Sequence, residues 1–191
     1  ETNNTIKNVG LFDLTPFSKF EIKSDKAHQE LQKICTANIK NEPGKCVYTH
    51  MLNSDGGIET DLTVVCVDKN HFRIISSAAT RERDKFHINK HLSKNIELKD
   101  ITDDLCVFGL FGPKSRDLLK TLSEDNFEND QFRFGFAKFI TIDGVKIWTQ
   151  RLSYVGELGY ELYVDLKDAK KIYELLIEKG KDFNLSNCGM H

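Results

Sequence analysis

Asp61 is the residue with the clearest potential for chemistry. It lies in residues 51–67, MLNSDGGIETDLTVVCV, just after a turn rich in Asn, Ser, Asp and Gly. The residues around Asp61 otherwise have the alternation of a partly buried strand. A carboxylate is a poor strand former and is costly to bury without partners. The sequence leaves three explanations for Asp61: a buried hydrogen bond, an edge position in the sheet, or a role in catalysis.

Two further carboxylates lie in the segment YVGELGYELYV, residues 154–164. Glu157 lies in a predicted loop between Gly156 and Gly159, and glycine allows a backbone to approach a ligand closely. The residues alone leave Glu157 equally open to a solvated and to a functional role. Glu161 is predicted to lie within a strand, where a solvent-facing side chain is the simple expectation.

The histidines and cysteines give weaker indications. His87 and His91 are four residues apart on a predicted helix, a spacing that can hold a metal ion. No HExxH motif or third ligand accompanies them, so we interpret both as solvated and predict no metal site. His50 lies two residues after Tyr48, opposite the strand of Asp61, and is interpreted as a structural or rim residue. None of the cysteines has the neighbours of a nucleophile.

Two cycles of strands and helices are predicted to position these residues. Periodicity and turn residues predict the first cycle as strands at 17–22, 45–52, 58–67 and 72–76, with helices at 24–35 and 80–92. The second is predicted as strands at 105–112, 132–142, 145–152 and within 154–164, with helices after residue 113 and at 165–180. Residues 1–10 are interpreted as a loose polar lead-in.

This order of elements predicts an α+β fold. It consists of two related strand-helix-strand-strand lobes, residues 11–100 and 101–191, with mostly antiparallel sheets that carry helices on one face. A doubly wound nucleotide fold is disfavoured, because hairpins outnumber crossovers and no glycine fingerprint links a strand to a helix.

Composition argues against several classes of function. The 191 residues carry a formal net charge of −2, so they have no bulk attraction to nucleic acid or an anionic membrane. No window approaches about 18 consecutive apolar residues, and the N-terminus lacks the features of a signal peptide. The five widely spaced cysteines fit a reducing compartment. We expect a cytoplasmic protein, or a mitochondrial-matrix protein in a eukaryote, and one processed or cut from a longer chain because it lacks an initiator Met.

Four motifs, taken in order and spacing, resemble the folate-binding aminomethyltransferase family, the family of the glycine cleavage T-protein. They are FDLTPFSKFEI, YTHMLNSDGGIETDLTV, FGPKS and RLSYVGELGYELYV. The sequences of these motifs are most similar to the C-terminal tetrahydrofolate-binding half of dimethylglycine and sarcosine dehydrogenases. Thr60 stands where T-proteins tend to have a first Asp, which favours this dehydrogenase-like branch. The resemblance covers nearly the whole chain and implies a T-protein-like folate-binding domain.

The resemblance implies a tetrahydrofolate site with Asp61 as the essential carboxylate. Near folate N5, a carboxylate can orient the amine and handle its proton while N5 attacks a methylene group on an iminium or aminomethyl donor. The implied function is one-carbon transfer in glycine, sarcosine or dimethylglycine breakdown, which forms 5,10-methylenetetrahydrofolate. The alternative is a non-catalytic folate-binding or assembly module derived from the same fold.

The family's pterin-binding Glu falls on Glu157, where a carboxylate can accept two parallel N–H bonds from the pterin edge. Tyr154 and Met51 are expected to pack against the ring, and Ser76 and Ser77 follow a strand end that lines the site in relatives. The resemblance implies tetrahydrofolate as cofactor, and FAD only if a flavoprotein half is fused or partnered.

The expected partners are folate, a small amine donor, and an FAD-dependent dehydrogenase half or a lipoyl carrier protein; nucleic acid and membranes are not expected. We also expect the family's small C-terminal barrel to be absent, and residues 187–191 resemble the start of a helix that completes the folate site in relatives. We therefore expect a fragment or a truncated paralogue.

Overall fold

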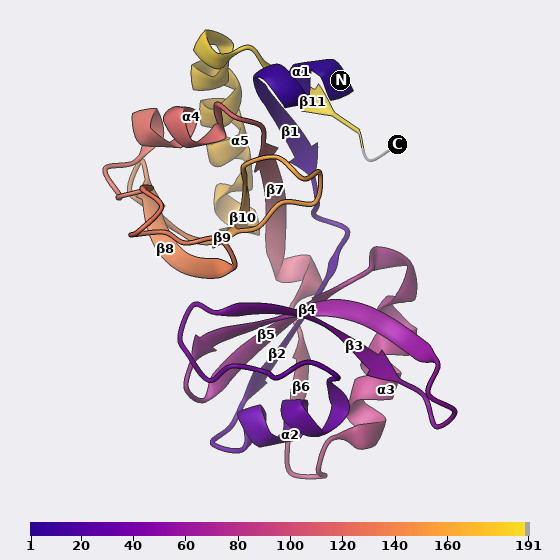
Figure 1. The fold of residues 1–191 in the computed structure, drawn as a ribbon. Coiled ribbons are helices and arrows are strands. Elements are labelled where there is room, and N and C mark those ends of the chain that lie inside the picture. Colours follow the sequence, from indigo (N-terminus) through magenta and orange to yellow (C-terminus); the bar gives the residue numbers. More distant parts are fainter. Residues whose placement is uncertain (190–191) are drawn as a thin grey trace. The chain divides into compact units, whose positions relative to one another are not determined.

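The computed structural model describes residues 1–189 and forms two compact units (Figure 1). One unit is Pro16–Thr102, and the other joins Glu1–Thr15 to the chain from Asp103 onward. The sequence placed residues 11–15 with the first lobe. The structure places them with the second, because their strand pairs there with two strands from later in the chain.

The unit Pro16–Thr102 is built on a five-stranded sheet with the strand order β3-β4-β5-β2-β6, in which every pair is antiparallel. Two helices, α2 and α3, pack on one face of this sheet, since their apolar residues share one core with the strands. The elements are β2 (Ser18–Lys23), α2 (Ala27–Ile34), β3 (Cys46–Leu52), β4 (Ile58–Asp68), β5 (His71–Ser76), η1 (Ala78–Thr80), α3 (Arg81–His91) and β6 (Leu98–Asp100).

The hairpin of β3 and β4 has the turn that the sequence predicts. Asn53 holds the turn, because its side-chain Oδ1 accepts hydrogen bonds from the backbone N–H groups of Asp55 at 3.0 Å and Gly57 at 2.9 Å. Gly56 has a φ of 81°, which glycine adopts without strain. The strands pair from Cys46↔Val65 to Leu52↔Ile58, with one irregularity near the turn. The hairpin therefore fixes which side chains share a face of the sheet.

The second unit is built on a six-stranded sheet with the order β11-β1-β7-β10-β9-β8, and its apolar core lies between one face and the helices α4 and α5. Among the strands of residues 1–189 in this sheet, β1 and β11 pair in parallel and the other pairs are antiparallel. The elements are α1 (Thr2–Lys7), β1 (Val9–Asp13), η2 (Thr102–Asp104), β7 (Leu105–Phe111), α4 (Ser115–Leu122), β8 (Phe136–Ile142), β9 (Val145–Arg151), β10 (Gly159–Asp165), α5 (Leu166–Gly180), η3 (Lys181–Phe183) and β11 (Leu185–Cys188).

Both ends of the chain differ from the expectation. The polar lead-in predicted for residues 1–10 is wrong, because α1 and the start of β1 lie there and Val9 is fully buried. The predicted helix start at residues 187–191 is wrong as far as the structure describes it. Leu185–Cys188 instead forms β11 beside β1, while residues 190 and 191 lie outside the described part.

The predicted fold class is confirmed, because both sheets are mainly antiparallel and each carries helices on one face. Within residues 1–189, no helix is long and apolar enough to cross a membrane. All five cysteines are free thiols.

Candidate functional site

Asp61 lies on β4 with its side chain exposed, on the face of the sheet opposite α2 and α3. Its neighbours Thr60 and Leu62 are buried, as the alternation of a strand requires. A buried hydrogen bond is wrong as an explanation, since Asp61 is exposed. Although β4 lies between β3 and β5, the pairing with β5 begins at Leu62, so Asp61 pairs only with His50 of β3 and is locally at an edge. Because Asp61 is exposed, folding does not strip water from its carboxylate. The contacts that Asp61 makes must therefore indicate its role.

Two side chains of β3 accompany Asp61 on this face. Tyr48 Oη donates a hydrogen bond to Asp61 Oδ2 at 3.0 Å, and His50 is the direct cross-strand partner of Asp61. The rings of Tyr48 and His50 meet edge to face, with centroids 5.2 Å apart. The hydrogen bond to Asp61 raises the pKa of the Tyr48 hydroxyl, so Tyr48 remains a donor. This hydrogen bond orients the Asp61 carboxylate on the exposed face of the sheet.

The structure places Met51 and Ser76 on the other face of the sheet. Met51 is fully buried in the core with α2 and α3, so it presents no surface to a ligand here. Ser76 pairs with Leu62 and is 3% exposed, and its Oγ finds no hydrogen-bond partner among residues 1–189. Met51 and Ser76 therefore do not share a surface with Asp61 on which one ligand could contact all three residues.

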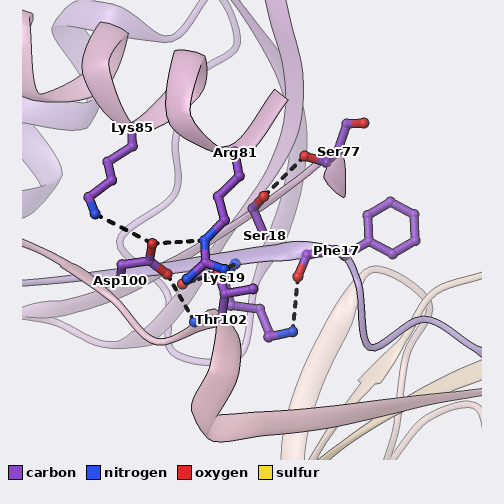
Figure 2. Close-up of polar contacts among 8 residues, drawn as sticks. All are labelled: Phe17, Ser18, Lys19, Ser77, Arg81, Lys85, Asp100 and Thr102. Carbon is purple, nitrogen blue, oxygen red and sulfur yellow. Dashed lines mark hydrogen bonds and ion pairs between the residues drawn. The ribbon is translucent and has the colours of Figure 1, made fainter. Parts of the chain in front are cut away.

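Ser77 follows β5 and contacts Ser18, and a separate group of polar contacts lies nearby at the start of α3 (Figure 2). Ser18 Oγ donates to the Ser77 carbonyl at 3.0 Å. Nearby, Asp100 accepts a hydrogen bond from Arg81 Nε at 2.9 Å and forms an ion pair with Lys85 at 3.6 Å. Burial raises the pKa of Asp100, but the bonds from Arg81 and from a threonine outweigh it and lower the pKa to about 2. The bond from Ser18 therefore holds the strand end that carries Ser77.

Tyr154 and Glu157 lie in the loop between β9 and β10, which belongs to the six-stranded unit. Tyr154 is 69% exposed, and Glu157 is half-buried. Gly156 between them has a φ of 80°, and a Cβ added to it would meet no atom within 4 Å. The loop therefore presents an aromatic ring and a carboxylate beside open space. These two residues lie in one unit and Asp61 lies in the other.

Glu161 is a candidate that the sequence reasoning missed, because we expected it to face solvent. Burial raises the pKa of its carboxyl group to about 7, against the effect of a 2.8 Å hydrogen bond from Tyr163 Oη. Its cross-strand partner Gln150 is fully buried, and neither amide atom of Gln150 finds a hydrogen-bond partner within residues 1–189. Strand alternation could have predicted the burial of Glu161, because Glu161 shares a face of the sheet with the large aromatic side chains of Tyr163 and Trp148.

The raised pKa of Glu161 predicts a specific pH dependence of stability. In the unfolded chain the pKa of this carboxyl is the ordinary 4.5 of a glutamate, whereas in the folded protein burial raises the pKa to about 7. The folded state then holds the proton more tightly, so the stabilisation is complete below about pH 4.5 and is lost as the pH rises to about 7. The free energy of unfolding of wild type should fall by roughly 3 kcal/mol across this range because of Glu161, and Glu161→Gln should not show this fall.

Urea unfolding of wild type and Glu161→Gln at pH 4.5, 6 and 8 tests this prediction. Other titrating groups are common to both proteins and cancel in the difference. A difference in unfolding free energy that stays constant over the three pH values would contradict it.

His87 and His91 line a pocket of about 210 Å³ with Cys35, Thr36 and Lys33, together with Ile34 and Leu52. Burial raises the pKa of the Cys35 thiol to about 12, which makes it a poor metal ligand at neutral pH. No group of three His, Cys, Asp or Glu side chains in residues 1–189 is arranged to hold a metal ion. The pocket therefore contributes nothing to the candidate site.

The fold is shared with a solved aminomethyltransferase structure. The glycine cleavage system aminomethyltransferase T from Bartonella henselae superposes with a TM-score of 0.83 at 19% identity, over 97% of this chain and 49% of that protein. The sequence model of the GCVT N-terminal domain family matches residues 1–191. The chain belongs to this family, which confirms the resemblance drawn from the four motifs.

Named relatives include an oxidase, a dehydrogenase and an aminomethyltransferase. The chain is 34% identical over 184 residues to 4-methylaminobutanoate oxidase (formaldehyde-forming) from Paenarthrobacter nicotinovorans, covering 96% of this chain and 22% of that protein. It is 31% identical to mitochondrial dimethylglycine dehydrogenase from Rattus norvegicus, covering 100% and 22%. It is 29% identical to the aminomethyltransferase of Natranaerobius thermophilus, covering 100% and 52%. The chain thus spans from about a fifth to about half the length of these relatives.

Proposed function

We propose that this chain is the folate-binding part of a one-carbon transferase, in which tetrahydrofolate accepts a methylene group and becomes 5,10-methylenetetrahydrofolate. The observation that carries this proposal is the exposed Asp61, held by Tyr48 just beyond the hairpin turn, in a chain of the GCVT N-terminal domain family. A carboxylate on an open face can meet a ligand amine directly. In this proposal the activity rests on chemistry at this one group.

In this proposal Asp61 orients the N5 amine and takes its proton as the new C–N bond forms. Tyr48 fixes one carboxylate oxygen, which leaves the other to face the amine. Proximity and general acid–base catalysis supply the rate, because the donor carbon of an iminium is already electrophilic. Tetrahydrofolate supplies the two nitrogens between which the methylene group is finally held.

The pterin edge presents amide-like donors and acceptors, and residues of the six-stranded unit fit such a group. Glu157 remains the residue that the family resemblance proposes for this contact. Glu161 offers a second carboxylate for this contact, since it is half-buried on β10 rather than fully buried.

The donor and the partners belong to the same proposal. Two relatives are named as an oxidase and a dehydrogenase, which supports an FAD-dependent flavoprotein half that supplies an iminium from sarcosine or dimethylglycine. The aminomethyltransferase relatives support the second route, in which a lipoyl carrier protein brings the aminomethyl group from glycine. The proposed compartment is the cytoplasm, or the mitochondrial matrix in a eukaryote.

Calorimetric titration with tetrahydrofolate tests the binding half of this proposal. Wild type should bind, and loss of a charge-assisted contact to the pterin in Glu157→Ala should weaken binding by roughly 10-fold or more. Glu124→Ala serves as the matched control, because Glu124 is an exposed carboxylate in a loop of the same unit. Absence of heat with wild type at millimolar ligand would overturn the folate proposal. Weakened binding in Glu161→Gln alone would move the pterin contact from Glu157 to Glu161.

A non-catalytic binding or assembly module is the second candidate. The name of the Paenarthrobacter relative says that it forms formaldehyde, which favours a member of this fold that does not itself complete the transfer. This candidate predicts that transfer to tetrahydrofolate does not depend on Asp61.

A further inference from the structure

Asp61 lies in the part of the β3–β4 hairpin that extends beyond β5. The pairing of β4 with β5 starts at Leu62, which faces Ser76, the last residue of β5. Among the described strands, β3 is the one that borders residues 58–61. Two strands without a third neighbour are only marginally stable in water. Other contacts must therefore hold this end of the hairpin, and with it the Asp61 carboxylate, in one position.

The segment after α2 holds the β3 side of this end. The Thr36 N–H donates to the His50 carbonyl at 2.9 Å, and the His50 N–H donates to Thr36 Oγ1 at 3.3 Å. One residue further on, the Ala37 N–H donates to Thr49 Oγ1 at 3.0 Å. Because His50 is the cross-strand partner of Asp61, these bonds fix the edge of β3 directly opposite the carboxylate.

Arg83 of α3 holds the β4 side. Its Nη2 donates a hydrogen bond to the Glu59 carbonyl oxygen at 2.6 Å, and its Nε lies 3.7 Å from Glu59 Oε1. Ile58 and Thr60 pair with consecutive residues of β3, so Glu59 between them is the extra residue of a β-bulge. Such an extra residue has no partner in the ladder. Arg83 therefore supplies from α3 the donor that a third strand would supply at this position.

The guanidinium of Arg83 also contacts the first turns of its own helix. Its Nη2 lies 3.6 Å from Asp84 Oδ1, and the other oxygen of this fully buried carboxylate accepts a hydrogen bond from Thr80 Oγ1 at 2.7 Å. Arg83 thus links the start of α3 to the bulge of β4. The Arg83 side chain is 52% exposed, and exposed ion pairs contribute only about 0–1 kcal/mol to stability. A role in positioning fits these contacts better than a role in stability.

We propose that Arg83 is a positioning residue for the proposed transfer, which holds the overhanging end of β4 so that the Asp61 carboxylate meets the N5 amine of tetrahydrofolate. The inference rests on the proposed function and adds a residue to it. Glu59 precedes Asp61 by two residues, so a shift of the bulge moves Asp61 as well. Misplacement of a reacting group by about 1 Å can lower a rate by roughly 100-fold. Arg83 acts on the transfer through Asp61.

The transfer rate of wild type and Arg83→Ala at saturating tetrahydrofolate tests the inference. Transfer is measured above the uncatalysed rate, with an iminium formed in situ from formaldehyde and sarcosine. Arg83→Ala should be roughly 10-fold slower, with a tetrahydrofolate affinity within about 2-fold of wild type. Arg83→Lys should recover part of the rate, because lysine keeps a donor for the carbonyl but lacks the fork of arginine. Lys90→Ala is the matched control, since Lys90 is an exposed cation in the last turn of the same helix.

Amide hydrogen exchange followed by NMR tests the contact without any reliance on activity. The amides of residues 58–61 should exchange roughly 10-fold faster in Arg83→Ala than in wild type, because the end of the hairpin opens more often. The amides of β5 should exchange at the wild-type rate, which a general loss of stability would not allow.

Equal exchange rates for residues 58–61 in wild type and Arg83→Ala would overturn the inference, whatever the activity. Faster exchange with an unchanged transfer rate would overturn the positioning role and leave the proposed function standing. If wild type shows no transfer above the uncatalysed rate, the proposed function fails and the positioning role fails with it. Weaker tetrahydrofolate binding that accounts for the whole loss in Arg83→Ala would also overturn it, because Arg83 would then act on binding.

Discussion

Asp61→Asn is expected to lower the rate of one-carbon transfer by roughly 10²- to 10⁴-fold, the usual contribution of a general acid–base group. An amide keeps the size and a hydrogen-bonding oxygen of the carboxylate, so Tyr48 can still donate to it. The amide cannot accept the N5 proton. Affinity for tetrahydrofolate should therefore change far less than the rate.

The transfer assay with in situ iminium and calorimetry with tetrahydrofolate measure these two quantities on the same preparations. Asp61 is exposed, so Asp61→Asn should leave the unfolding free energy within about 0.5 kcal/mol of wild type. Asp55→Asn is the matched control, because Asp55 is exposed in the turn of the same hairpin. Equal transfer rates in wild type and Asp61→Asn would support the non-catalytic module instead.

Gly112→Ala is expected to destabilise the fold by roughly 3–5 kcal/mol, near the upper limit for a single substitution. Gly112 has a φ of 127°, and a Cβ there would lie 2.3 Å from the Asn8 carbonyl oxygen and 2.6 Å from that of Thr5. Both obstacles are backbone atoms, so no side chain can move aside. The first residues of the chain would have to shift away from β7.

Urea unfolding compares Gly112→Ala with Gly144→Ala. Gly144 also has a positive φ, 78°, but a Cβ there would meet no atom within 4 Å. Gly144→Ala should lose only about 1–2 kcal/mol from backbone strain. Similar losses in the two variants would show that strain at φ, rather than contact with Asn8 and Thr5, limits this position.

Local signals were sufficient for most elements of the fold. The β3–β4 hairpin could be predicted because its Asn, Asp and Gly residues specify the turn, and the turn specifies the register. The ends of the chain could not be predicted locally. The parallel pairing of Val9 with Leu185 joins residues far apart in sequence, and neither short strand contains a signal for the other.

The candidate site was predictable in part. Resemblance placed Asp61 and Glu157 by motif, and the structure adds Tyr48 as the residue that holds Asp61. Met51 shows the limit of this reasoning, because proximity to the turn suggested ring packing while strand alternation directs its side chain into the core. The expectation for Glu161 was wrong, because a carboxylate between two apolar residues of a strand was assumed to face water.

The most direct test of the account is the fate of a labelled carbon. Wild-type protein is mixed with tetrahydrofolate, sarcosine and ¹³C-formaldehyde, and the appearance of ¹³C in 5,10-methylenetetrahydrofolate is followed by NMR. The account predicts that the label appears faster than without protein and that Asp61→Asn returns the rate to the uncatalysed one. A wild-type rate equal to the rate without protein would contradict it.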